Sequence, residues 1–185
     1  MNNKKFSTFK LVFVGVMAAV IYVVTMFRFP LFGSKVHFAN AMCLLSGLLF
    51  GPLYGGLSAG FGSGLYDLLN GYPIDEALVT FVSKFAMAWV CAKISRAGQT
   101  KGDNHVRNLI ACIAGALTYV LLYMLKQFVY KHFISGMMLE ATFGVMLSKL
   151  PASLLNAAAA VIVTPPLFAA LHLSLKKAGL LEHMY

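Results

Sequence analysis

Long apolar runs, separated by short polar or Gly/Pro-containing breaks, fill most of the chain. They cover 11–27, 39–50, 53–69, roughly 75–93, 109–130 and 151–177. About 20 apolar residues are needed to cross the hydrocarbon of a bilayer as a helix. The pattern therefore predicts six helices, of which the second, at this length, need not cross the bilayer fully.

The breaks between the runs fix where we expect helices to begin and end. Gly51-Pro52 predicts a tight corner between two helices, because Pro removes a helical donor and Gly permits the turn. Asn70 to Pro73 reads as a turn, after which Asp75 can cap the next helix. Pro151 suits the first turn of the last helix. We expect a single membrane-embedded domain over 1–185, with the first run retained as a helix rather than cleaved as a signal peptide.

Composition supports a membrane location. Of the 185 residues, 59% are hydrophobic and only 11% are charged, against about a quarter charged in soluble domains. These values exclude a water-soluble globule and predict an all-α, integral membrane six-helix bundle.

The positive charge is best interpreted as a topology signal. The formal net charge is +9, but the cations gather at the ends of apolar runs instead of on one exposed face, so nucleic-acid binding is not predicted. One side of the predicted bundle is rich in them, and the positive-inside rule makes that side cytoplasmic, with both termini on it. Its cations are Lys4, Lys5, Lys10, Lys93, Arg96, Lys101, Arg107, Lys176 and Lys177.

The opposite, outer side collects most of the acids, and a lysine lies deep beneath them. Asp67, Asp75, Glu76 and Glu140 all fall there, whereas Lys84 lies roughly 13 Å below the start of its helix. An ammonium at such depth costs at least ~2.5 kcal/mol unless a counter-charge, a polar cavity or a ligand meets it. Snorkelling to the interface is the alternative, but a polar outer pocket is the better explanation.

Several further polar residues are expected to line this pocket. We take Asp67 as the partner of Lys84. The other candidate ligand-binding residues are Tyr66, Asn70 and His37 on the outer side, Ser153 and Asn156 early in the last helix, and Gln127 and Lys149 at the outer ends of the last two helices. For each of them, helix capping, interhelical hydrogen bonding or interfacial anchoring is the competing role.

Motifs for other chemistries are missing from the sequence. No Lys-Ser/Thr follows the glycines at 60–64, so a phosphate-binding loop is not predicted, and neither HExxH nor a Cys-x-x-Cys spacing occurs. Cys43, Cys91 and Cys112 lie in apolar runs and read as small buried side chains. We expect no metal, no cofactor and no enzymatic activity.

Three segments in this order give the chain a family resemblance. They are the small-residue face at Gly15 to Ala19, the run 41–64 with its Gly-Pro corner, and Asp75-Glu76-Ala77 leading to Lys84. With six helices over nearly the whole length, the chain resembles the substrate-binding S components of energy-coupling factor (ECF) vitamin transporters.

The resemblance implies a function and partners. It implies capture of a water-soluble vitamin or precursor from outside, with 29–37 as a lid, and docking in the membrane on a transmembrane coupling protein and two ATPases. The family docks through an Ala-xxx-Ala face on its first helix; here Gly15, Ala18 and Ala19 are expected to do so, with Gly15 departing from the pattern. Pyridoxine or hydroxymethylpyrimidine is the favoured ligand, and riboflavin is its nearest rival.

Two other classes of function stay open at this point. A self-sufficient carrier or channel is disfavoured, because the spans hold no acidic residue except near their outer ends. A small membrane enzyme using Asp67, Asp75 or Glu76 would require turnover by the isolated chain.

Overall fold

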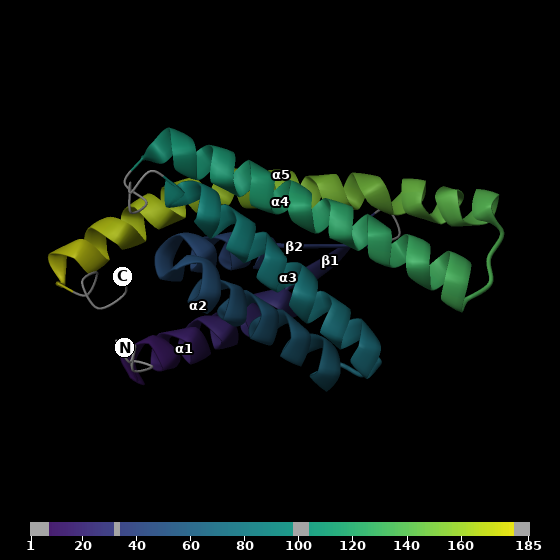
Figure 1. The fold of residues 1–185 in the computed structure, drawn as a ribbon, viewed down its shortest axis with the longest axis horizontal. Helices are drawn as coiled ribbons and strands as arrows, with labels where there is room; N and C mark the ends of the chain where they lie inside the picture. The colour runs from purple at the N-terminus through teal and green to yellow at the C-terminus, as the bar shows by residue number, and fades with distance from the viewer. Residues whose placement is uncertain (1–7, 32–33, 98–103, 180–185) are drawn as a thin grey trace, which may run out of the picture.

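The structure is a computed structural model that describes residues 8–31, 34–97 and 104–179. Figure 1 shows helices that run back and forth along one long axis, with the start of the first helix and the end of the last at the same end of the molecule. A small antiparallel hairpin lies in the middle of the bundle. The elements are α1 (Thr8–Met26), β1 (Arg28–Leu31), β2 (Ser34–His37), α2 (Ala39–Leu69), α3 (Ile74–Ser95), α4 (His105–Phe128), the π-helical η2 (Val129–Ile134) and α5 (Leu139–Lys177).

The predicted corner at Gly51-Pro52 lies inside α2. Gly51 has φ 81°, outside the helical region, and divides α2 into two legs. The last carbonyls of the first leg lack helical donors, and the Arg96 guanidinium donates to the carbonyls of Leu48 and Leu49 at 3.4 and 3.1 Å. Over the described ranges, the expectation of six helices is thus corrected to five α-helices, one of which contains the two predicted legs.

Other predicted boundaries are wrong. The last helix begins at Leu139, so Pro151 lies in its interior instead of in its first turn. Asp75 is the second residue of α3 and not its cap, because Pro73 occupies the cap position. The fifth predicted helix begins earlier, at His105, where the Asn104 side chain accepts the Arg107 N–H.

The hairpin is the one part of the described chain that an all-α interpretation misses. β1 pairs antiparallel with β2, and Arg28 lies opposite His37. Each strand has four residues, too short for an alternating pattern to stand out between two long apolar runs. The hairpin joins α1 to α2 near the middle of the bundle (Figure 1).

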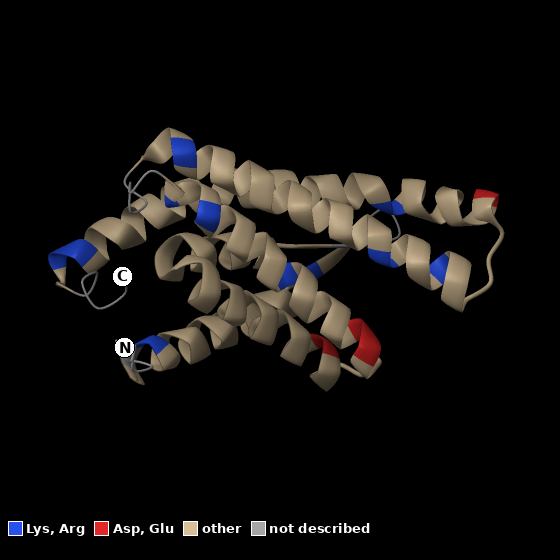
Figure 2. Ribbon diagram, viewed as in Figure 1, with Lys and Arg blue, Asp and Glu red and all other residues tan. Residues whose placement is uncertain are grey.

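The helices suit a bilayer by length and apolarity. Four of them, α2, α3, α4 with η2, and α5, are long and apolar enough to cross, and α1 is a shorter apolar helix. Large hydrophobic side chains such as Leu121, Leu147 and Ile162 are about 70% exposed on the bundle surface, as lipid-facing positions require. Figure 2 shows lysines and arginines at both ends of the bundle, whereas the acidic residues all lie toward the end away from the described termini. The end at which α1 begins and α5 ends therefore carries cations without acidic residues, and we call it the cation-rich end.

Small residues close the half of the bundle nearest the chain's first and last described residues. A side-chain carbon at Gly47 would lie 2.5 Å from the Ala88 carbonyl oxygen, and one at Gly115 would lie 2.7 Å from Leu44. Cys43, Cys91 and Cys112 are fully buried in this core. Helix backbones therefore approach closely here, as small residues allow in membranes.

Candidate functional site

A cavity of about 300 Å³ occupies the other half of the bundle. Its size lies at the lower end of the range for small-molecule sites, ~300–1,000 Å³. Every described helix except η2 contributes to its wall, and so do both strands of the hairpin. The lining residues are Thr25, Arg28, His37, Ala39, Ser63, Tyr66, Asp67, Tyr72, Glu76, Thr80, Ser83, Lys84, Tyr119, Tyr123, Lys126, Gln127, Lys149, Ser153 and Asn156.

Lys84 forms part of the cavity floor and is only 3% exposed. Its ammonium donates to Asn40 Oδ1 and lies 3.5 Å from the centre of the Tyr119 ring. These two contacts replace the water that a buried charge loses. The pocket predicted around this lysine is therefore present in the structure.

Asp67 is a neighbour of Lys84 and not its direct ion-pair partner. Its carboxylate is close enough to Lys84 and Lys126 for their charges to interact, and Thr80 lies beside it. Among the described residues the ion pair at this cavity joins Lys126 to Glu76 at 2.9 Å. The expected Lys84–Asp67 pair is thus corrected: Asp67 keeps a carboxylate facing the same space without neutralising Lys84 by contact.

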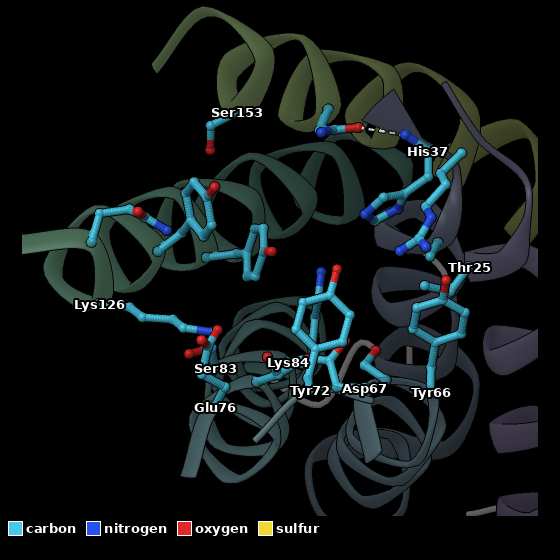
Figure 3. Close-up of a pocket in the computed structure, with 18 of the residues that line it drawn as sticks. Thr25, His37, Tyr66, Asp67, Tyr72, Glu76, Ser83, Lys84, Lys126 and Ser153 are labelled. Atoms are coloured by element: carbon cyan, nitrogen blue, oxygen red, sulfur yellow. Dashed lines mark hydrogen bonds and ion pairs between the residues drawn. The ribbon is translucent and has the colours of Figure 1, made fainter. Parts of the chain in front are cut away.

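The α5 wall carries hydrogen-bonding side chains at helical spacing. Lys149 Nζ donates to Gln127 Oε1 at 2.8 Å, and Asn156 Oδ1 accepts the His37 backbone N–H at 2.9 Å. The second bond joins the hairpin to α5 (Figure 3). Ser153 lies between these two positions and is 4% exposed; its hydroxyl has no hydrogen-bond partner among the described residues.

Four tyrosines supply flat surfaces. Tyr66 and Tyr72 come from the α2 end and the loop after it, whereas Tyr119 and Tyr123 stack on each other along α4 with ring centres 6.1 Å apart. The Arg28 guanidinium lies 5.3 Å from the centre of the Tyr66 ring. Aromatic faces combined with a few directed polar groups are typical of a site for a planar heterocycle.

Most of the predicted site residues meet at this cavity. Asn70 does not: its side chain is exposed and donates to the Tyr66 carbonyl at 2.8 Å, which completes the last turn of α2. A polar side chain at a helix end can bond the nearby backbone instead of a ligand, and Asn70 does so here. The remaining candidates that line the cavity are His37, Tyr66, Asp67, Lys84, Gln127, Lys149, Ser153 and Asn156.

Two of the three predicted docking residues are exposed, and the third is buried. Gly15 and Ala19 are exposed on α1, and nothing lies within 4 Å of a side-chain carbon built at Gly15. Ala18 is 8% exposed, and its carbonyl would lie 2.6 Å from a side-chain carbon at Gly62 of α2. Ala18 therefore packs inside the bundle, away from the free face.

Sequence reasoning missed several lining residues. Thr80 and Tyr123 stand four residues from Lys84 and Tyr119, so a search for polar or aromatic positions at i, i+4 would have found them. Asn40, which accepts the Lys84 hydrogen bond, lies in an apolar run, where an amide is itself a signal. Arg28 gave no such signal, since its place depends on the unforeseen hairpin.

The comparison with protein families decides the class of the chain. The family of ECF-type riboflavin transporters, S component, matches residues 5–173. The chain belongs to this family. As an S component it is a subunit of a vitamin transporter that works with an energy-coupling module, it crosses the membrane several times, and it is not an enzyme.

Two other proteins are similar to this chain in fold or in sequence. A solved structure of the S component of a bacterial ECF transporter superposes with a TM-score of 0.64 at 19% identity, covering 90% of this chain and 97% of that one, and so shares the fold. An uncharacterized protein in a gap 3' region of Pyrococcus woesei is 34% identical over 113 residues, which are 60% of this S component and 72% of the relative.

The family match corrects one expectation. The matching family is the riboflavin type, so it does not support pyridoxine or hydroxymethylpyrimidine as the favoured ligand. The preference for a small pyridine or pyrimidine came from the overall resemblance of the chain to the S components. Six helices and small-residue faces do not distinguish one ligand of these proteins from another.

Proposed function

We propose that this S component captures riboflavin from the outer side of the cell membrane for ATP-driven uptake. The observation that carries the proposal is the cavity of about 300 Å³ lined by four tyrosines and a buried ammonium. A flavin combines a flat heteroaromatic ring, whose carbonyl oxygens accept hydrogen bonds, with a hydroxylated chain. The name of the matching family supports the same ligand.

The floor and the carboxylate would orient the ring. Lys84 is a donor that cannot accept, so it would bind a ring carbonyl oxygen, and Asp67 is an acceptor for a ring N–H or a hydroxyl. Tyr72 offers a face for stacking, whereas the Arg28 guanidinium already lies over the Tyr66 ring. The Lys84 ammonium already lies over Tyr119, so we expect the ring to rest above the lysine and not on that face.

Entry and release would involve the hairpin. His37 and Arg28 belong to β2 and β1 and line the cavity, so any ligand inside touches the segment that joins α1 to α2. The hydrogen bond from the His37 N–H to Asn156 holds this segment against α5. Breaking that bond would remove one of the contacts that hold the hairpin against α5.

Orientation and docking follow the charges and the free face of α1. The cation-rich end is proposed to be cytoplasmic, with both termini there, by the positive-inside rule. The exposed Gly15 and Ala19 are proposed to pack against the transmembrane coupling protein of a module that also contains two ATPases.

Binding and uptake measured separately test the proposal. Quenching of flavin fluorescence by the purified chain should show saturable binding in the nanomolar-to-micromolar range. Vesicles that hold the chain alone should not accumulate riboflavin, and vesicles that also hold an energy-coupling module and ATP should. Uptake by the chain alone would instead indicate a self-sufficient carrier.

A separate substitution tests the proposed docking on the coupling protein. Gly15→Leu places a bulky group on the exposed α1 face, where no atom of the described residues lies within 4 Å of a side-chain carbon at this position. Riboflavin affinity should stay within about twofold, whereas co-purification with the coupling protein should be lost. The matched control is Gly144→Leu on α5, which is also exposed and open and should preserve assembly. Normal assembly of Gly15→Leu would remove α1 from the docking face.

A further inference from the structure

Like the α3 side, the α5 side of the cavity presents polar side chains and no aromatic ring, in contrast to the sides formed by α2 and α4. The lining residues from α5 are Lys149, Ser153 and Asn156, which carry an ammonium, a hydroxyl and an amide. None of the described lining residues from α5 is aromatic, whereas tyrosines come from α2, α4 and the loop after α2. A flat ring therefore finds its stacking surfaces away from α5.

These three residues form a row along the helix. They are four and three residues apart, so they share one face and span about 10 Å along the axis. A row of separate hydrogen-bonding groups matches an extended chain that carries several hydroxyls better than it matches the edge of one ring.

Ser153 supplies the independent observation that points to a ligand. Hydroxyls in transmembrane helices commonly donate to the carbonyl four residues earlier, and in this chain they do so at Thr25, Ser58, Ser83, Thr118, Thr142, Thr164 and Ser174. Ser153 is buried as well, yet its Oγ has no partner among the described residues. In Figure 3 this oxygen points into the cavity, across from Tyr72 and Lys84.

The two neighbours of Ser153 are held in place by other elements. Lys149 Nζ donates to Gln127 on α4, and the Asn156 side-chain oxygen accepts from the hairpin. Leaving a buried hydroxyl without a hydrogen-bond partner costs free energy. We therefore expect the Ser153 hydroxyl to bond a hydroxyl of the ligand when the cavity is occupied.

We propose that Lys149, Ser153 and Asn156 form a polyol subsite that binds the hydroxylated chain of the ligand, with Ser153 as its specificity-determining residue. The inference rests on the proposed function, which it deepens by assigning the two parts of a flavin to two parts of the cavity. The ring lies over Lys84 among the tyrosines, and the chain lies along α5.

The test compares two ligands that share a ring. Riboflavin and lumiflavin carry the same isoalloxazine, but lumiflavin has a methyl group in place of the hydroxylated chain. Both are titrated, by quenching of their fluorescence, against the unchanged protein, Ser153→Ala and Lys84→Met. Ser148→Ala is the matched control, because Ser148 is exposed on the same helix and bonds Val145 O at 2.8 Å.

Ser153→Ala should weaken riboflavin about fivefold to tenfold, the usual loss for one hydrogen bond, and leave lumiflavin within twofold. Lys84→Met should weaken both ligands by the same factor, and Ser148→Ala should weaken neither. Equal losses for both ligands in Ser153→Ala, or no loss of riboflavin, would overturn the subsite while leaving the proposed function intact. Failure of the unchanged protein to bind either flavin would overturn both proposals.

A third ligand, whose hydroxylated chain carries a phosphate, extends the test, because the Lys149 ammonium could also bind a phosphate. Flavin mononucleotide should bind no more than about threefold more tightly than riboflavin if the subsite is built for hydroxyls. A preference of tenfold or more for the phosphate form, lost in Lys149→Gln, would overturn the polyol assignment in favour of an anion subsite.

Discussion

The two halves of this bundle are made from the same helices, yet one encloses an apolar core and the other a polar cavity. Toward the cation-rich end, α3, α4 and α5 present Met87 and Cys91, Ala111 and Ala116, and Ala157 and Phe168 to a closed apolar core. Toward the other end, the same three helices present only polar and tyrosine side chains to an open cavity: Glu76, Thr80, Ser83 and Lys84; Tyr119, Tyr123, Lys126 and Gln127; and Lys149, Ser153 and Asn156.

The change occurs at one level on each of these three helices. Lys84 is followed by Met87 on α3, Tyr119 is preceded by Ala116 on α4, and Asn156 is followed by Ala157 on α5. The first leg of α2 begins at this level, so that Asn40 meets Lys84 while Cys43 already belongs to the core. A rigid, close-packed half thus supports a floor on which polar groups can be held in fixed positions.

The largest expected effect comes from forcing the closed half apart. Gly47→Ala would bring a methyl group to about 2.5 Å from the Ala88 carbonyl oxygen, so a backbone must shift. We expect the free energy of unfolding to fall by about 1–3 kcal/mol, measured as a lower midpoint of thermal unfolding in detergent. Gly144→Ala has nothing within 4 Å and is the control. Equal stability of the two variants would contradict close packing in that half.

The second-largest effect is expected from removing the charge of Lys84, which lies where the apolar core meets the cavity. Lys84→Met keeps the stem of the side chain but loses the ammonium, and riboflavin affinity should fall about tenfold to a hundredfold, as for a hydrogen bond from a charged group. Calorimetric titration measures the affinity, and the thermal midpoint verifies that the variant folds. Unchanged affinity in a folded variant would remove Lys84 from the binding site.

A smaller change is expected where the hairpin meets α5. Asn156→Ala removes the acceptor of the His37 N–H, which lies 2.9 Å away. Amide exchange at His37 should quicken about fivefold, the equivalent of one hydrogen bond, whereas exchange in the α4 core around Ala111 stays unchanged. Exchange can be followed residue by residue by mass spectrometry with electron-transfer fragmentation. An unaltered rate at His37 would mean that other contacts hold the hairpin.

The smallest effect concerns a residue that the sequence assigned to the site and the structure does not. Asn70→Ala removes a bond to the Tyr66 carbonyl at the exposed end of α2. Riboflavin affinity should change by less than about twofold, because an exposed helix-end contact contributes little to binding. A tenfold loss would show that Asn70 reaches the ligand after all and that the cavity extends beyond the walls described above.

The sequence predicted most of the polar cavity because burying charge and amide groups in lipid is expensive. A lysine 3% exposed in a membrane helix has few structural reasons to exist, and Ser153 and Asn156 follow it by the same logic. The turn at Gly51 was foreseen because Gly-Pro leaves a helix few alternatives. These predictions follow from local chemistry.

What escaped prediction depends on contacts between distant residues. The hairpin, and with it Arg28, is made by strands of four residues whose pairing no local pattern announces. Pro151 sits within α5 because the apolar, lipid-facing stretch that begins at Leu139 continues the helix through it. Lys84 bonds Asn40 and not Asp67, which lie on opposite legs of α2. Which leg meets Lys84 depends on how α2 turns at Gly51, and residue spacing along the chain does not give that geometry.

The most direct test of the central claim is native mass spectrometry of the protein purified in detergent from cells that make riboflavin. The account predicts a non-covalent adduct with the mass of one riboflavin per chain, with lower occupancy in Lys84→Met and unchanged occupancy in Gly15→Leu. Protein that is folded but carries no flavin, or that carries a different vitamin in its place, would contradict the account.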